Sequence, residues 1–325
     1  MMNSAQHVIR LRVMTYNVGG GRKDKRSDAS AALHVIKSLS PDILGAQEIY
    51  ELQDASGRHY RMSTSIVRAL GHRTSGFFGP TLSMEQHFHV RKALFVDGLF
   101  GDWVNWTQGN ALFSRWPFVR FGDPHRRGEP RNIPLYRPAV YDGTRDTDSR
   151  YVILGRIGKG ACRPFVMTTH YTTLLGERSG PAKRRMRGRA VDEARSIRQE
   201  QSEAVIQLAQ SHILENNELL FLMGDFNAVA EEPCIARTFL KNQPPLVRLV
   251  PSNEELATHR MKVSRPVDHI LVFPGNRRLE YTCWIQGGTR VDSASDHRPV
   301  VADITVYEPG SKRFQTLGPG VVRID

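Results

Sequence analysis

Short stretches along the chain carry either strand-like or helix-like patterns of apolar residues. Residues 8–18 alternate apolar and polar positions and end in Asn17 and a run of glycines, which predicts a strand. Residues 28–40 repeat apolar residues at helical spacing and stop before Pro41, and residues 196–214 carry a longer apolar stripe. Both of these stretches therefore predict amphipathic helices.

Further elements follow the same two patterns, and together they indicate the fold class. A second short helix is predicted over residues 65–72. Strands are predicted over residues 42–49, 109–118, 150–158, 165–173, 218–226, 266–273 and 299–307. The predicted strands interleave with helices but also form hairpins. This combination favours a layered α/β fold with mixed sheets rather than a doubly wound fold with a parallel sheet. The chain has no internal repeat and no Ser/Gly linker, so one main domain is expected.

Ionisable or amide side chains stand at or just past the ends of these apolar runs. Burying a lone carboxylate is costly unless it is paired or binds a metal ion, so these positions need partners. Strand ends in α/β folds are also where functional groups collect beside an accessible cleft. The residues are Asn17, Glu48, His170, Asp225, Asn227, Asp268, Asp296 and His297.

The chemistry of this set favours a hard divalent cation. Carboxylate and amide oxygens with few nitrogens and no thiol favour Mg²⁺ or Mn²⁺ over Zn²⁺. Such a cation would supply the missing counter-charge, polarise a phosphoryl oxygen and stabilise a leaving group. The two histidines would move protons near neutral pH. Taken singly, each residue has an ordinary structural explanation, such as a turn residue or a strand cap.

The balance of charge favours an anionic partner. Lys and Arg number 45 against 33 Asp and Glu, which gives a net charge of +12 and a pI near 9.9. Nucleic acid, an anionic membrane surface and phosphorylated small molecules are all compatible with this charge. Arg184 and Arg185 lie in a basic segment, residues 182–189, that could grip a phosphate backbone or a lipid headgroup. A solvated basic loop explains the segment equally well.

Cysteine content and hydropathy indicate the compartment. The three cysteines, Cys162, Cys234 and Cys283, are widely spaced and form no CxxC motif, so buried free thiols in a reducing compartment are expected. The N-terminus lacks the apolar core of a signal peptide, and no segment approaches the ~18 apolar residues of a membrane span. We therefore expect a cytoplasmic protein with at most peripheral membrane contact.

Two tryptophans lie just before one predicted strand. Exposed side chains of Trp103 and Trp106 could stack on bases or enter a lipid interface. Tryptophan is more often part of a core, and this interpretation is preferred here.

Seven motifs that contain these polar residues occur in a fixed order. They are MTYNV at 14–18, AQE at 46–48, GNALFSRWP at 109–117, TTH at 168–170, GDFN at 224–227, PVDHI at 266–270 and SDHRPV at 295–300. The ordered set resembles the endonuclease/exonuclease/phosphatase superfamily, which has the deoxyribonuclease-I-like fold. The resemblance implies a four-layer α/β sandwich, with two mixed β-sheets packed face to face and helices on the outer sides. It covers residues 8 to 307, so a domain over 1–307 and a C-terminal tail over 308–325 are expected.

The resemblance also implies a role for each matching residue. Glu48 corresponds to the principal metal-binding carboxylate, with Asn17 beside it and Asp296 completing the metal site. Asp225 and Asn227 correspond to the pair that orients the attacking water and contacts the scissile phosphate.

The histidines and their neighbours are matched in the same way. His297 corresponds to the histidine that acts as general base or contacts the phosphate, and Asp268 to the carboxylate that fixes its tautomer. His170 falls where many members have a histidine that donates to the phosphate or leaving group, and where abasic-site endonucleases usually carry tyrosine. Asp148 and Arg150 are loose candidates for the neighbours of that histidine. Asn110 is a weaker candidate for a phosphate contact.

The activity implied is metal-dependent hydrolysis of a phosphoester by in-line attack of water. Nucleic acid is the leading substrate, because the chain is basic. The alternative within the same chemistry is a sphingomyelinase-like or phosphoinositide phosphatase activity on lipid headgroups. A non-catalytic phosphate-binding module is a third interpretation, against which the intact set of site residues argues.

Overall fold

Two mixed β-sheets form the centre of the molecule. The computed structural model describes residues 8–19, 22–23, 26–27, 29–71, 73–160, 162–174, 187–260, 263–307 and 322–324. In this part of the chain the first sheet has the strand order β16-β14-β15-β1-β4-β7-β6, with β5 paired to β4, and the second has the order β12-β13-β11-β10-β9-β8. The pairs β1–β4 and β10–β11 are parallel and the other pairs are antiparallel.

The strands of the first sheet are β1 (Val8–Asn17), β4 (Ile43–Asp54), β5 (His59–Arg61), β6 (Ser75–Ser83), β7 (Trp103–Ser114), β14 (Arg278–Ile285), β15 (Val300–Tyr307) and β16 (Val322–Ile324). Those of the second are β8 (Arg131–Tyr136), β9 (Arg150–Arg156), β10 (Phe165–His170), β11 (Leu220–Asp225), β12 (Val247–Arg248) and β13 (Asp268–Phe273). A small hairpin pairs β2 (Arg22–Lys23) with β3 (Arg26–Ser27).

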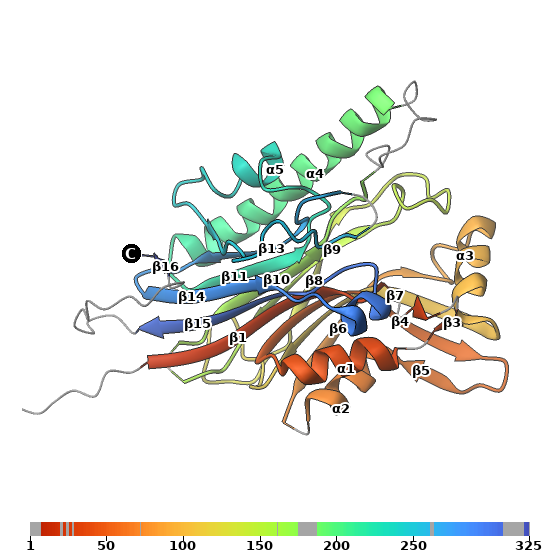
Figure 1. The fold of residues 1–325 in the computed structure, drawn as a ribbon, viewed down its shortest axis with the longest axis horizontal. Helices are drawn as coiled ribbons and strands as arrows, with labels where there is room; N and C mark the ends of the chain where they lie inside the picture. The colour runs from red at the N-terminus through yellow and green to blue at the C-terminus, as the bar shows by residue number, and fades with distance from the viewer. Residues whose placement is uncertain are drawn as a thin grey trace, which may run out of the picture.

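Helices cover the outer side of each sheet, as Figure 1 shows. The first sheet packs against α1 (Ser30–Leu39), α2 (Met62–Leu70) and α6 (Thr289–Ala294). The second packs against α4 (Arg187–Ala209), the π-helical turn Gln210–Leu214 that continues it, and α5 (Pro233–Ala236). One further helix, α3 (Val90–Phe100), lies at one end of the molecule. The four-layer sandwich expected from the sequence is therefore confirmed.

Strand alternation distributes the apolar side chains between three core layers. Along β1, Leu11 and Val13 point into the layer between the sheets, whereas Met14 and Tyr16 point toward α1 and α2. Strands of this kind are buried on both faces, which explains why their sequences read as nearly continuous apolar runs.

The three cysteines are free and buried, as expected. Trp106 is also in the core, with 1% of its surface exposed.

Several elements were not predicted by the sequence patterns, among them β6, α3, β8 and β14. The strands β6 and β8 are the outermost strands at one edge of each sheet, and each contains a proline, Pro80 or Pro134. Proline removes a ladder donor and is tolerated at edges, so a proline-containing run is easily taken for a loop. The strand expected over 109–118 begins earlier, at Trp103. Within the stretch expected to be a tail, Val322–Ile324 pairs with β14 as β16.

No helix in the described residues is long and apolar enough to cross a membrane.

Close packing of the two sheets generates a first prediction, at Gly45 in β4. A Cβ at this position would lie 2.5 Å from Thr168 Oγ1 and 2.9 Å from the Met223 side chain, both in the second sheet. Gly45→Ala should therefore lower the free energy of unfolding by about 1–3 kcal/mol, because the sheets must separate locally. Urea unfolding followed by circular dichroism measures this value.

The matched control is Gly98→Ala in α3, where nothing lies within 4 Å of the added Cβ. This change should be neutral or stabilising by up to about 1 kcal/mol, because alanine favours a helix. Equal effects of the two substitutions would contradict the packing argument.

Candidate active site

The polar strand ends meet at one edge of the two facing sheets. In the second sheet, His170 at the end of β10 and Asp268 at the start of β13 are both in register with Asp225 at the end of β11. Asn17 ends β1 in the opposite sheet, and its Nδ2 donates to Asp225 Oδ2 at 3.0 Å. Residues separated by more than 200 positions along the chain are thus in direct contact.

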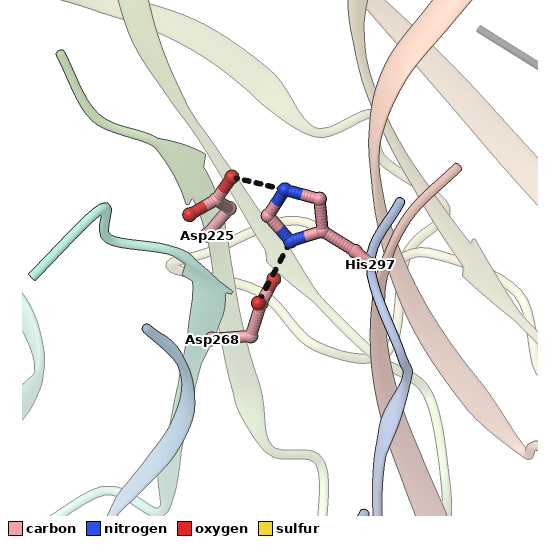
Figure 2. Close-up of side chains that lie close together, drawn as sticks. All are labelled: Asp225, Asp268 and His297. Carbon is pink, nitrogen blue, oxygen red and sulfur yellow. Dashed lines mark hydrogen bonds and ion pairs between the residues drawn. The ribbon is translucent and has the colours of Figure 1, made fainter. Parts of the chain in front are cut away.

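His297 lies between two carboxylates, as Figure 2 shows. Its Nδ1 donates to Asp268 Oδ2 at 2.9 Å, and its Nε2 lies 3.6 Å from Asp225 Oδ2. The segment before it is fixed to the first sheet, because Ser295 Oγ donates to the Asn17 carbonyl at 2.8 Å and accepts from the His297 N–H at 3.1 Å. The ring has one defined position, with Nε2 facing Asp225.

The surroundings give the two histidines opposite protonation states. Burial alone would lower the pKa of His297, but the charges of Asp268 and Asp225 outweigh it and raise this pKa to about 10. Burial, reinforced by the charge of Arg150, lowers the pKa of His170 to about 3. His170 Nε2 lies 3.4 Å from Asp225 Oδ2. Near neutral pH the site therefore contains one imidazolium and one neutral imidazole, both beside Asp225.

A β-bulge directs Glu48 toward the same edge. The pairing of β4 with β7 shifts between Ala46 and Ile49, and Glu48 adopts a left-handed backbone with φ of 57°. Such a conformation is uncommon for a residue other than glycine, and bulges often redirect a side chain next to a functional site. Glu48 Oε1 accepts from Asn17 Nδ2 at 3.4 Å. Asn17 thus connects Glu48 with Asp225.

The two other amide candidates differ in position. Asn227 has a left-handed backbone with φ of 47°, donates its N–H to Asp225 Oδ1 at 2.9 Å and lines the pocket at this edge. Asn110 Nδ2 donates to the Tyr151 carbonyl at 3.3 Å, and Asn110 is not among the residues that line the pocket. The structure therefore brings Asn227, but not Asn110, to the pocket.

Comparison with known proteins identifies the family. The model of the "Endonuclease/Exonuclease/phosphatase family" matches residues 14–297. The chain belongs to this family. Its members generally hydrolyse phosphoester bonds and commonly use divalent metal ions. A search of curated proteins found no match.

Solved structures share the fold at low sequence identity. An endonuclease/exonuclease/phosphatase from Beutenbergia cavernae superposes with a TM-score of 0.59 at 18% identity, over 93% of this chain and 72% of that chain. The human nocturnin catalytic domain, solved with a bound sulfate anion, gives 0.58 at 17% identity, over 93% and 97%. A protein of the same family from Bacteroides vulgatus gives 0.57 at 16% identity, over 91% and 98%.

Two groups of family residues could hold the divalent ion. Asn17 donates to the half-buried carboxylate of Glu48 and to the buried carboxylate of Asp225, and its neutral amide offsets little of their charge, so a cation fits there. Asp225, Asp268 and His297 also place one ligand atom each within 4.8 Å of one another. The His297 ring already bridges that second pair of carboxylates, so the Glu48 side of Asp225 is the better position.

Three further sequence candidates are Asp296, Arg184 and Arg185. Asp296 is half-buried, and its Oδ1 would lie 3.0 Å from a Cβ at Gly19, just beyond the end of β1. Its role as a metal ligand stays a prediction. Arg184 and Arg185 lie outside the described residues, and their role in substrate binding also stays a prediction.

Sequence reasoning missed several residues that line the pocket beside Glu48. Arg150 and Asp148 were loose candidates, and the structure places both in the pocket wall. The others are Tyr50, Lys92, Phe95, Gln108, Arg145 and Thr173. Lys92 and Phe95 belong to α3, a helix that the sequence patterns did not reveal. No motif distinguishes these residues, because each stands at an ordinary position in its element.

The raised pKa of His297 generates a second prediction. The stabilisation that the charged ring contributes is fully present below the ordinary pKa near 6.5 and is lost as the pH rises through about 10. The difference in free energy of unfolding between the wild type and His297→Gln should therefore shrink over this range. Chemical unfolding at about pH 6 and pH 10 with a chelator present, so that no cation competes with the proton, measures it. A constant difference contradicts the charge pairing.

Proposed function

We propose that the chain is a divalent-metal-dependent phosphodiesterase, using Mg²⁺ or Mn²⁺, whose leading substrate is nucleic acid. The observation that carries this proposal is the arrangement of His297, held at Nδ1 by Asp268 and directed at Asp225 across from Glu48 and Asn17. A carboxylate, an oriented imidazole and a cation-binding group at one pocket are the parts that hydrolysis of a phosphoester requires.

Each residue has a role that its surroundings support. When bound near Glu48 and Asn17, the cation would neutralise charge on the phosphate and on the leaving oxygen. Asp225 accepts a proton from the attacking water, which Asn227 helps to position. His297, charged because of its two carboxylates, donates from Nε2 to a phosphate oxygen. Neutral His170, also beside Asp225, donates a hydrogen bond to the leaving group.

Two observations support an anionic substrate of the nucleic acid type. The net charge of +12 attracts polyanions and would accelerate their association. The related nocturnin structure carries a sulfate, which has the tetrahedral shape and charge of a phosphate group. The basic segment around Arg184 and Arg185 would add contacts to the phosphate backbone.

The proposal is tested by hydrolysis of a panel of phosphoesters, with Mg²⁺, Mn²⁺ or a chelator. The panel contains single- and double-stranded DNA, RNA, a chromogenic bis-phosphodiester, sphingomyelin and phosphoinositides. Metal-stimulated cleavage of DNA or RNA is expected. Failure to hydrolyse any member with either metal would favour a non-catalytic phosphate-binding module.

A third prediction concerns Glu48 as a metal ligand. Loss of groups that only support metal ligands commonly costs about 10–100-fold in metal affinity or activity. Glu48→Gln removes a ligand charge and should raise the metal concentration needed for half-maximal turnover by about tenfold or more. Activity as a function of Mg²⁺ concentration measures this value.

The matched control is Glu51→Gln in the same strand, where the carboxylate accepts from Ser63 instead of facing the pocket. This variant should keep the wild-type metal dependence. If Glu48→Gln also keeps it, the cation does not bind at Glu48.

A specific observation favours lipid headgroups as the second candidate substrate. On and just before α3, Phe88, Val90 and Leu94 are 59%, 62% and 67% exposed, while Lys92 and Phe95 of the same helix line the pocket. Exposed apolar side chains next to a site are typical of attachment to a membrane interface.

A fourth prediction separates this candidate from the first. If the substrate is a lipid, the double substitution Phe88→Ser and Leu94→Ser should lower turnover on vesicles several-fold and leave cleavage of a soluble chromogenic diester unchanged. Co-sedimentation with vesicles and parallel turnover assays measure the two effects. Unchanged turnover on vesicles would exclude α3 as the attachment surface.

A further inference from the structure

The pocket has an end lined by carboxylates and histidines and an adjoining end lined by more cations than carboxylates, and Arg150 of the second end acts through its charge on His170 of the first. One end carries the carboxylates and histidines described above. The other is formed by α3 and by the segment before β9, and its charged side chains are Lys92, Arg145, Arg150 and Asp148. Nothing in the proposed hydrolysis uses Lys92 or Arg145, although both line the same pocket as Glu48 and His297.

Lys92 is a buried ammonium group directed into this end. Its residue is 4% exposed, and its Nζ donates to Gln108 Oε1 at 2.8 Å and lies 3.6 Å from Asp148 Oδ2. Lysine is almost never fully buried unless paired. Burial lowers the pKa of Lys92, which shows that the position is unfavourable for its charge.

Arg150 shares the same carboxylate oxygen. Its Nη2 lies 4.0 Å from Asp148 Oδ2 and donates to the Arg145 carbonyl at 3.0 Å. Its Nε is buried and has no hydrogen-bond acceptor among the described residues, although the residue is 5% exposed. A buried guanidinium donor without an acceptor is costly and needs an explanation.

Arg145 completes the group across the ring of Phe95. Its guanidinium carbon lies 5.4 Å from the ring centroid, and Lys92 Nζ lies 5.2 Å from the same centroid. Arg145 is the one member of the three that is partly exposed. Lys92 and Arg145 therefore share one aromatic ring, and Lys92 and Arg150 share one carboxylate. Asp148 also accepts from Tyr141 at 3.5 Å.

The charges at this end do not balance locally. Among the described residues, Asp148 is the carboxylate that pairs with Lys92 and Arg150, and Glu48 also acts on all three cations through its charge. A divalent ion bound at Glu48 would offset that carboxylate and leave Asp148 as the main counter-charge of the three cations. An anionic group that accepts from Arg150 Nε and pairs with Arg145 and Lys92 would relieve the imbalance. The scissile phosphate, beside Asp225 and His297, is the reacting group at the other end.

We infer that Lys92, Arg145 and Arg150 form a second anion subsite, which binds a phosphate group of the substrate next to the scissile one. This inference rests on the proposed phosphodiesterase function, because it places a substrate group relative to that site. Its ligand is a phosphoester with a second phosphate nearby. A nucleotide chain or a phosphorylated inositol headgroup both supply this chemistry.

The fifth prediction tests the subsite by binding rather than turnover. Adenosine 3′,5′-bisphosphate is compared with both adenosine monophosphates, and inositol 1,4-bisphosphate with inositol 1-phosphate. Calorimetry of the full chain in the presence of Ca²⁺ measures the binding affinity of each ligand, and this readout does not depend on hydrolysis. At least one bisphosphate should bind about tenfold or more tightly than its monophosphates, as expected for an added charge-assisted contact. Arg145→Gln should remove most of this advantage and change monophosphate binding little.

The matched control is Arg131→Gln. Arg131 also stacks on a ring, that of Phe121, but does not line the pocket. Arg131→Gln removes the same charge as Arg145→Gln, but it should leave the tighter binding of the bisphosphate unchanged. Lys92→Met should act like Arg145→Gln, and thermal unfolding of each variant shows that it is folded.

The outcomes separate the subsite from the activity. An advantage with only one ligand pair supports the subsite and identifies the substrate as nucleotide or inositol. Equal affinity for mono- and bisphosphates in the wild type, or an advantage that survives Arg145→Gln, overturns the subsite even if the enzyme hydrolyses diesters. A subsite that binds without turnover on any phosphoester would instead overturn the proposed hydrolysis.

Discussion

The structure depends on one electrostatic constraint, the burial of several carboxylates at a single edge of the paired sheets. Asp225 and Asp268 are each 1% exposed, and one imidazole ring is held between them. Such groups are tolerated only with counter-charges close by. His297 supplies one charge, and the Glu48 side of Asp225 is where a divalent ion would supply another. The positions of β1, β11 and β13 make this arrangement possible, because they deliver the residues from both sheets to one point.

The polar residues of the seven motifs were predictable from sequence because each interrupts an apolar strand. A carboxylate such as Asp225 at the end of a buried run has few structural explanations. The order of the seven motifs along the chain indicated both the family and the four-layer α/β sandwich. The structure confirms the fold and brings His297, Asp268, Asp225, His170, Asn17, Glu48 and Asn227 together.

What the sequence did not reveal has physical reasons. Lys92 is buried in a helix that exposes the apolar Val90 and Leu94, so the helix pattern resembles neither a surface helix nor a core helix. Arg145 lies in a segment without regular structure, and only tertiary contacts place it against Phe95. The raised pKa of His297 and the lowered pKa of His170 likewise depend on neighbours far apart in the chain.

The strand β16 has a consequence for how the molecule meets its neighbours. Its residues Val322–Ile324 pair with Leu279, Glu280 and Tyr281 of β14 and so occupy hydrogen-bonding groups that would otherwise be open to another chain. An exposed, regular strand invites strand addition and aggregation, whereas a very short terminal strand is a poor template. Shortening the C-terminus would uncover the eight-residue β14, so recombinant forms should retain these last residues to stay monodisperse.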